Sequence, residues 1–148
     1  DDEGVRVQPR DVVTNGVVKG YFLSCYSARK LGMESTGNAG GSHNLVMRSD
    51  QTRADDDLVG LLRKMHRGLL ITEVMGQGVN YVTGDYSRGA FGYWVENGEI
   101  VYPVEEITVA SNMKEMFKGI VAIGSDTLTR GSKTVGSILI NEMTIAGD

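Results

Sequence analysis

The sequence predicts an α+β fold dominated by strands: a largely antiparallel sheet, a sandwich or a partly closed barrel built from hairpins, with about three short helices. Twenty glycines against two prolines indicate many tight turns between short strands. Two Asn-Gly pairs, Asn15-Gly16 and Asn97-Gly98, lie between apolar runs, and this dipeptide favours the turn of a two-residue hairpin. At 148 residues and 41% hydrophobic content, we expect a single domain over residues 1–148 with one core.

The first half of the chain is expected to contain a hairpin and two helices. The elements follow from turn and cap residues: a hairpin of residues 11–14 and 17–23, a helix of residues 25–31, a loop at 34–42, a strand at 43–48 and a helix from residue 58 to 67. Ser24 is suited to cap the first helix and Gly32 to stop it. The second helix places leucines on one face, and Gly68 is expected to end it.

The stretch from Gly68 to Ala110 is expected to form the centre of the domain. Two strands, residues 69–74 and 90–95, flank a Gly-rich loop, and the second strand continues through the Asn97-Gly98 turn into a third. A two-residue turn would pair Val95 with Ile100, Tyr93 with Tyr102 and Trp94 with Val101. Both faces of this ribbon are then apolar, so we expect both to be covered.

The last part of the chain returns to short strands after one more helix. Ser111 is expected to cap that helix and Gly119 to end it. Residues 120–123 and 137–145 are apolar enough to be strands, whereas the polar segment 124–136 between them is expected to be irregular.

Composition excludes several classes of function. The net charge is −4 and basic residues are scattered among acidic ones, so we expect no nucleic-acid partner. No apolar run approaches the ~20 residues that cross a bilayer, so no membrane partner is expected. A lone cysteine and no signal pattern indicate a soluble cytoplasmic protein. The chain starts without methionine, which suggests a piece of a longer protein.

Few residues suggest chemistry by themselves. His43 and His66 have no ligand partners at turn spacing, and the sequence contains neither HExxH nor GxSxG. Residues 131–134, GSKT, resemble the end of a phosphate-binding loop but lack its glycine spacing. A helix N-terminus could lower the pKa of the Cys25 thiol, but with no histidine nearby in sequence a structural role is favoured. We therefore expect no catalytic residue and no metal ligand in this chain.

Two groups of charged residues are also better explained by structure. Asp85 and Arg88, three residues apart, are expected to pair with each other or with main-chain groups and so to hold the shape of the loop. Glu105 and Glu106 are adjacent in a strand, so they point to opposite faces and cannot act as a catalytic pair.

Three stretches of the sequence resemble one known family. Residues 24–41 (SCYSARKLGMESTGNAGG), 67–108 and 136–148 (GSILINEMTIAGD) are similar to the C-terminal domain of the TldD/PmbA family of metallopeptidases, once called modulators of DNA gyrase, and within it to the PmbA (TldE) branch. The resemblance covers nearly the whole chain. It marks a family-motif loop at Gly37, Asn38, Gly40 and Gly41, and it implies a C-terminal fragment of a longer protein.

The resemblance implies a heteromeric zinc metallopeptidase of the bacterial cytoplasm that processes unfolded or small peptides, including a microcin leader and an antitoxin. In the family a TldD-like subunit holds the zinc, through an HExxxH helix that lies upstream of this domain and a C-terminal cysteine. Residues 125–136, where that cysteine would lie, contain none here. The resemblance thus implies no cofactor in this chain, a TldD-like partner, and a domain that contributes to the chamber and to subunit contacts. The isolated chain is also able to form a homodimer on this reading. A free-standing β-rich module that binds peptide or protein is the alternative.

A peptidase for varied unfolded peptides is expected to recognise the main chain of an extended substrate at a sheet edge. Glycines allow another backbone to approach closely. The residues that fit this description form one loop with its flanks, which either faces substrate or only makes tight turns: Gly76, Gln77, Gly78, Asn80, Gly84, Asp85, Tyr86, Arg88 and Gly89.

Overall fold

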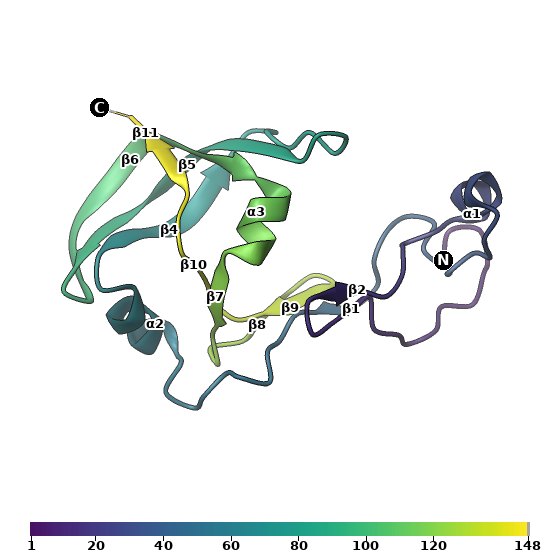
Figure 1. Ribbon diagram of the computed structural model, residues 1–148, viewed down its shortest axis with the longest axis horizontal. Coiled ribbons are helices and arrows are strands. Elements are labelled where there is room, and N and C mark those ends of the chain that lie inside the picture. Colours follow the sequence, from purple (N-terminus) through teal and green to yellow (C-terminus); the bar gives the residue numbers. More distant parts are fainter. Residues whose placement is uncertain (148) are drawn as a thin grey trace. The chain divides into compact units, whose positions relative to one another are not determined.

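The computed structural model describes residues 1–147 and divides into two compact units (Figure 1). The first unit contains Asp1–Val46 and Thr129–Thr134, and the second contains Met47–Leu128 and the segment that begins at Val135. Two such units can belong to one folding domain, so the expectation of a single domain stays a prediction. None of the helices in the described chain is long and apolar enough to span a membrane.

The first unit has short elements joined by long irregular segments. They are β1 (Val13–Thr14), β2 (Val17–Val18), α1 (Cys25–Leu31), β3 (Leu45–Val46), and most of the hairpin of β8 (Leu128–Arg130) and β9 (Lys133–Val135). β3 pairs with β9 in parallel, in a sheet of order β3-β9-β8. The first hairpin is confirmed: Asn15 and Gly16 have φ of 51° and 74°, and Val13 pairs with Val18.

The caps of α1 are those that the sequence predicts. The Ser24 hydroxyl accepts a hydrogen bond from the Ser27 amide at 3.2 Å, and the Ser27 hydroxyl accepts one from the Ser24 amide at 2.9 Å. Gly32 ends the helix in the left-handed region with φ of 64°. Glycine adopts this conformation without a steric penalty, so the sequence places this helix end correctly.

The second unit is built around one antiparallel sheet. Its elements are α2 (Leu58–Met65), β4 (Gly68–Met75), β5 (Asp85–Glu96), β6 (Glu99–Asn112), α3 (Met113–Lys118), β7 (Ile120–Ile123), β10 (Ile138–Ile140) and β11 (Thr144–Ala146). The main sheet has the order β11-β6-β5-β4, and β10 pairs with β7 in a second, smaller sheet. The β-dominated α+β class with three helices is confirmed, and no sheet in the described residues closes into a barrel.

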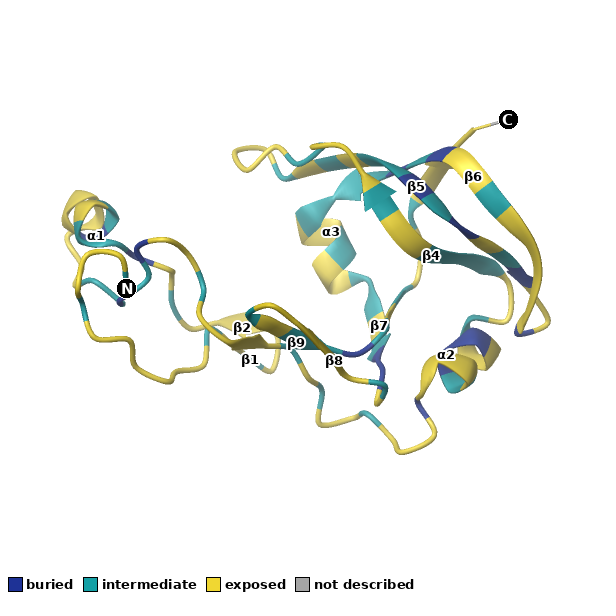
Figure 2. Cartoon of the chain, turned by 180° about the vertical axis from the view of Figure 1, so that it is seen from behind, coloured by how far each residue is buried: buried dark blue, intermediate teal, exposed yellow. Residues whose placement is uncertain are grey.

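The core of the second unit lies on one face of the main sheet. Ala90, Ile107 and Val109 are buried at its centre. Partly buried side chains pack against them: Leu69, Ile71, Val74, Tyr86, Val104 and Met143. Figure 2 shows the buried residues of this unit along β5 and β6 and in α2. The prediction that both faces of the β5–β6 ribbon are covered is wrong for β6, where residues 99–103 are exposed.

A bulge changes the predicted register of the central hairpin. Val95 pairs with Ile100 as expected, but Trp94 pairs with Tyr102 and Tyr93 with Pro103, because the register shifts between Trp94 and Val95. A second shift places Glu105 and Glu106 opposite the single residue between Ala90 and Gly92, and Glu106 has φ of 57°. Strict alternation therefore fails at the two glutamates, since a bulge inserts an extra residue into one strand.

Several predicted element ends are also corrected. α2 ends at Met65 with His66 as its C-cap, and Gly68 does not end it. The chain reverses at His66 (φ 60°, ψ −56°) with a hydrogen bond from the Arg67 amide to the Met65 carbonyl. Asn112, not Ser111, caps α3. The strand predicted at 137–145 is two strands, the strands predicted at 17–23 and 43–48 are much shorter, and the segment 124–136 contains β8 and β9. The predicted loop residues from Asp85 onward belong to β5.

The turn between β5 and β6 gives a direct test of the sheet. Asn97 and Gly98 have φ of 55° and 77°, and the Gly98 amide donates to the His66 carbonyl at 2.8 Å. Proline cannot adopt positive φ, so we expect Asn97→Pro to lower the free energy of unfolding by more than about 1 kcal/mol. Chemical denaturation measures this. Asn97→Gly is the control and should be close to neutral; an unchanged midpoint for the proline variant would contradict the turn.

Candidate functional site

The loop between β4 and β5, residues 76–84, folds back onto the first residues of β5. Gly76 turns the chain with φ of 75°, Val79 forms an isolated bridge with Tyr86, and the Ser87 amide donates to the Gly78 carbonyl at 2.7 Å. A Cβ atom on Gly78 would lie 1.5 Å from the Ser87 carbonyl oxygen. Gly78 is therefore required by this close main-chain contact, whatever else the loop does.

Asn80 organises the tip of this loop. Its side-chain oxygen accepts hydrogen bonds from the amides of Val82 at 2.9 Å and Thr83 at 3.2 Å. Its own main chain pairs with Asp85 and Gly84, each at 2.8 Å. These bonds form a turn of the kind that asparagine side chains stabilise, so the loop has a defined shape in the absence of any ligand.

Asp85 accepts hydrogen bonds from neutral groups and not from Arg88. The Thr83 hydroxyl donates to its carboxylate at 2.6 Å and the Asn112 amide at 3.3 Å. The hydrogen bond from Thr83, then that from Asn112, holds the pKa of Asp85 below its ordinary value, against a smaller effect of burial. Asp85 is thus an ionised acceptor at neutral pH, unsuited to donate a proton.

Arg88 holds the other end of the loop. Its guanidinium donates to the main-chain carbonyls of Met75 and Gly76. The two charged residues therefore hold the loop's shape, as the sequence predicts, but through separate partners. In the part of the chain that the structure describes, no ion pair joins Asp85 to Arg88.

The loop borders two shallow depressions, each of about 330 Å³. Between them they are lined by Gly76, Gln77, Gly78, Val79, Asn80, Tyr81, Asp85, Ser87 and Arg88. The structure thus brings most of the predicted loop residues together. Tyr86 instead packs against the core, and Gly84 lies against Asn112. Gly89 is in β5, where an added Cβ would meet only Met75, with the nearest atom at 3.6 Å.

Sequence reasoning did not single out Tyr81 and Val82, which are 94% and 95% exposed at the tip of the loop. Two adjacent apolar side chains between glycines are the signal that could have identified them. The depressions and the tip offer polar and apolar side chains, with Gln77, Gly78 and Val79 common to both depressions. Such a surface is suited to binding a polypeptide, and it contains no pair of groups arranged for acid-base chemistry.

The family-motif loop lies in the first unit. Asn38 accepts from Arg10 at 3.0 Å and from the Thr36 hydroxyl at 2.9 Å, and its amide nitrogen donates to the Gly41 carbonyl at 3.1 Å. Gly37, Gly40 and Gly41 all have positive φ. The conformation of this loop thus depends on its glycines, and its polar atoms are used within the unit.

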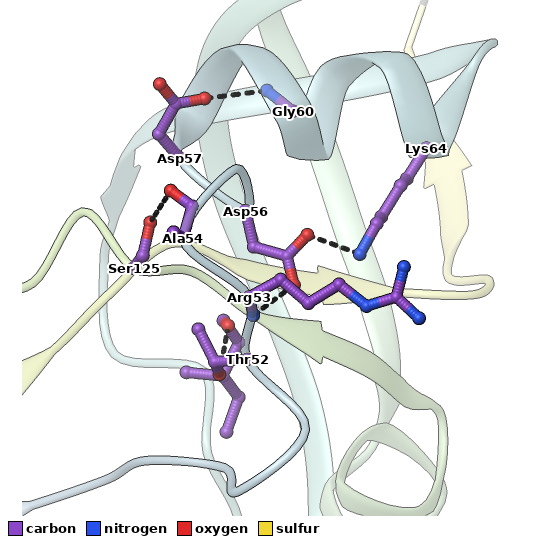
Figure 3. Close-up of polar contacts among 9 residues, drawn as sticks. Thr52, Arg53, Ala54, Asp56, Asp57, Gly60, Lys64 and Ser125 are labelled. Carbon is purple, nitrogen blue, oxygen red and sulfur yellow. Dashed lines mark hydrogen bonds and ion pairs between the residues drawn. The ribbon is translucent and has the colours of Figure 1, made fainter.

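A buried carboxylate outside the predicted site lies before α2 (Figure 3). Asp56 is 2% exposed; its side chain accepts from the Arg53 amide at 2.9 Å and forms an ion pair with Lys64. Its main-chain carbonyl accepts from the Ser125 amide at 2.8 Å. The neighbouring Asp57 is the helix cap, accepting from the Gly60 amide at 2.9 Å. Asp57 thus caps α2, whereas Asp56 joins this segment to the residues that follow β7.

The remaining candidates do not gather into a site. Among residues 1–147, no three His, Cys, Asp or Glu side chains lie close enough to hold a metal ion. A hydrogen bond with Glu3, then burial, raises the pKa of the Cys25 thiol, so the lowering that a helix N-terminus could cause is not seen. Gly131 and Ser132 form the turn between β8 and β9, and Lys133 and Thr134 lie in β9. Residues 131–134 lead into no helix, so they are not a phosphate-binding loop.

Comparison with known proteins identifies the family. Residues 1–147 match the model of the PmbA/TldA metallopeptidase C-terminal domain. The Metalloprotease PmbA homolog of Haemophilus influenzae is 53% identical over 148 residues, which is 100% of this chain and 32% of the relative. Metalloprotease PmbA of Escherichia coli O157:H7 is 51% identical over 99% of this chain and 32% of the relative. A crystal structure from Thermotoga maritima, a candidate modulator of DNA gyrase, superposes with a TM-score of 0.85 and 38% identity over 99% of this chain and 35% of that one. The chain therefore spans about a third of the length of these relatives and belongs to the PmbA/TldA metallopeptidase family, as its C-terminal domain.

Proposed function

We propose that this chain is the C-terminal domain of a non-catalytic, PmbA-like subunit of a heteromeric zinc metallopeptidase in the bacterial cytoplasm. The observation that carries the proposal is the match to PmbA relatives over the whole chain. A TldD-like subunit would supply the zinc and the catalytic groups. The pair would process unfolded or small peptides, such as a microcin leader or an antitoxin, and this domain would contribute to the chamber and to subunit contacts.

The residues of this chain do not fit a zinc site of the kind that metallopeptidases use. Such a site takes about three protein ligands held together, and the described residues offer no group of three. Residues 125–136 contain no cysteine, histidine or glutamate. No residue of this domain is therefore proposed to act through a metal, and the zinc is assigned to the partner subunit.

Metal analysis tests this assignment. After exhaustive dialysis, we expect less than about 0.1 zinc per chain, because zinc affinity depends on several ligands held together. Inductively coupled plasma mass spectrometry measures the ratio. Stoichiometric zinc, lost on replacement of His43, His66 or Cys25, would mean that the chain carries a metal site of its own.

The loop at residues 76–84 and the start of β5 are the proposed contact with an extended substrate. Two features support this: shallow depressions lined by the loop and the first residues of β5, and a loop whose shape needs no ligand. A strand added at such a surface would be recognised by its main chain, which suits peptides of varied sequence. The alternative, that the glycines serve only the turns, applies to Gly78, whose contact with Ser87 leaves no room for a side chain.

Gly89→Val in the longer protein that carries this domain distinguishes the two roles. Gly89 has room for a side chain beside Met75, so we expect the variant to fold and to assemble with its partner subunit while cleaving an unstructured peptide at least about tenfold more slowly. Val121→Ser, an exposed change on β7, is the control for assembly and rate. Cleavage at the unmodified rate by a correctly assembled Gly89→Val protein would exclude the first residues of β5 from the substrate site.

A further inference from the structure

Two hairpin turns of the chain contain the same reactive dipeptide, Asn15-Gly16 and Asn97-Gly98. In such a pair the main-chain nitrogen of the second residue can attack the side-chain carbonyl carbon of the asparagine and close a cyclic imide. Glycine has no Cβ to hinder this attack, so asparagine is most labile before glycine. The attacking nitrogen must be free of hydrogen bonds and the turn must open. The surrounding structure therefore decides which of the two pairs reacts.

The turn between β5 and β6 is held closed. The Gly98 amide, which would be the attacking group, donates to the His66 carbonyl at 2.8 Å, and Gly98 is buried. The turn joins strands of 12 and 14 residues, and the neighbouring Val95 is fully buried. Opening this turn would break main-chain pairing and expose part of the core, so the reactive state is costly here.

The turn between β1 and β2 lacks each of these restraints. Asn15 and Gly16 are both exposed, and each of the two strands contains only two residues. In the part of the chain that the structure describes, the Gly16 amide donates to no other main-chain group, and a Cβ on Gly16 would have no neighbour within 4 Å.

Little besides the strand pairing holds this first hairpin closed. One further hydrogen bond, from the Lys19 amide to the Val12 carbonyl at 2.8 Å, extends it. The valines of the two strands are more than half exposed: Val13, Val17 and Val18. A hairpin this short has little stability of its own, so it opens at a low cost in free energy.

We propose that Asn15 is a site of spontaneous deamidation in the folded protein, whereas Asn97 in the same dipeptide is protected. The Gly16 nitrogen loses its proton and forms a bond to the Asn15 side-chain carbonyl carbon. The bond from that carbon to the amide nitrogen breaks, and the nitrogen leaves as ammonia. Water then opens the imide at either carbonyl and leaves aspartate or isoaspartate, with no change of oxidation state.

Either product changes the first hairpin. Both add one negative charge at position 15. Isoaspartate also runs the main chain through the side-chain carbon, which lengthens the backbone and no longer fits a two-residue turn with positive φ at both positions. The proposal concerns this hairpin alone and does not depend on the peptidase role.

Peptide mapping by liquid chromatography and mass spectrometry tests the proposal. The longer protein that carries this domain would be incubated at mildly alkaline pH, both folded and unfolded in urea, and the deamidated peptides followed with time. The rates in urea are the reference for each pair. We expect folding to slow Asn15 by less than about tenfold and Asn97 by at least about a hundredfold, since only the second turn needs a large opening.

Asn15→Gln is the matched control. Its longer side chain closes the corresponding ring much more slowly, so the product should disappear from the first hairpin while the rate at Asn97 stays unchanged. Product that persists in that peptide would overturn the assignment to Asn15. Equal slowing of Asn15 and Asn97 on folding would overturn the proposal too, because the first hairpin would then be as well protected as the second.

Discussion

Replacing Lys64 by methionine is expected to lower the melting temperature by on the order of 5–10 °C. The change leaves the buried Asp56 carboxylate with only the Arg53 amide as donor. An ionised group that is buried without its partner is costly, and here the same residue joins the segment before α2 to Ser125, just after β7. Thermal unfolding followed by circular dichroism measures the effect.

Lys118→Met is the matched control. Lys118 forms an ion pair with Glu115 at 3.5 Å, and both side chains are more than 60% exposed. Exposed pairs contribute little, so this variant should melt close to the wild type. Equal effects of the two lysine changes would mean that burial of Asp56 has no energetic consequence.

The pKa of Asp56 also predicts how the free energy of unfolding changes at acid pH. The hydrogen bond from Lys64, then that from the Arg53 amide, keeps the pKa of Asp56 below its ordinary value in the folded chain. Its contribution to stability is therefore complete above the unfolded pKa of about 3.9 and is lost as the pH falls through the lower folded value. Asp56→Asn should accordingly lose less stability than the wild type between about pH 5 and pH 3.

Gly92→Ala is expected to cost on the order of 3 kcal/mol of unfolding free energy. Gly92 lies in the centre of the main sheet, where β4 and β5 shift register, and an added Cβ would lie 1.8 Å from the Leu70 carbonyl oxygen. The contact is with main chain, so it cannot be relieved by a side-chain rotation. The two strands would have to separate locally, and urea denaturation measures the loss.

Gly89→Ala provides the comparison within the same strand. Its nearest new contact would be the Met75 side chain at 3.6 Å, an ordinary van der Waals distance. We expect this variant to remain within about 1 kcal/mol of the wild type. If both glycine variants were equally stable, β4 could not lie against β5 as the structure has it.

The parts of the fold that the sequence predicts are those decided by local chemistry. Positive φ at Asn15-Gly16 and Asn97-Gly98 requires residues that tolerate it, so both hairpin turns could be located. The same is true of the Ser24 cap and the Gly32 stop of α1. In each case the residues that determine the structure are adjacent in the sequence.

The missed features depend on contacts between distant segments. β8 and β9 are short and polar, and β9 lies between β8 and β3, with which it pairs in parallel although β3 comes almost ninety residues earlier. The bulges at Val101 and at the two glutamates depend on how β5 and β6 twist together, which no local pattern encodes. Asp56 resembles a second helix cap until its pairing with Lys64 and Ser125 is seen.

In the candidate site, too, the sequence predicts the features set by neighbouring residues and misses those set by contacts between distant segments. Its glycines mark a loop that the structure confirms between β4 and β5, and most of the predicted residues line its depressions. The partners of Asp85 and Arg88 could not be deduced, since Asn112 and the Met75 carbonyl come from other strands. The sequence places Tyr86 in the loop, whereas its position in the core depends on the register of β5 with β6.

Co-purification with a peptidase assay tests the proposed subunit role most directly. The longer protein that carries this domain would be recovered from its own cells by a mild affinity step and assayed, alone and with any bound subunit, on an unstructured peptide. We expect a TldD-like subunit to be recovered with it, zinc to follow that subunit, and cleavage to require both. Recovery of the protein alone, with bound zinc and full peptidase activity, would contradict the assignment of a non-catalytic subunit.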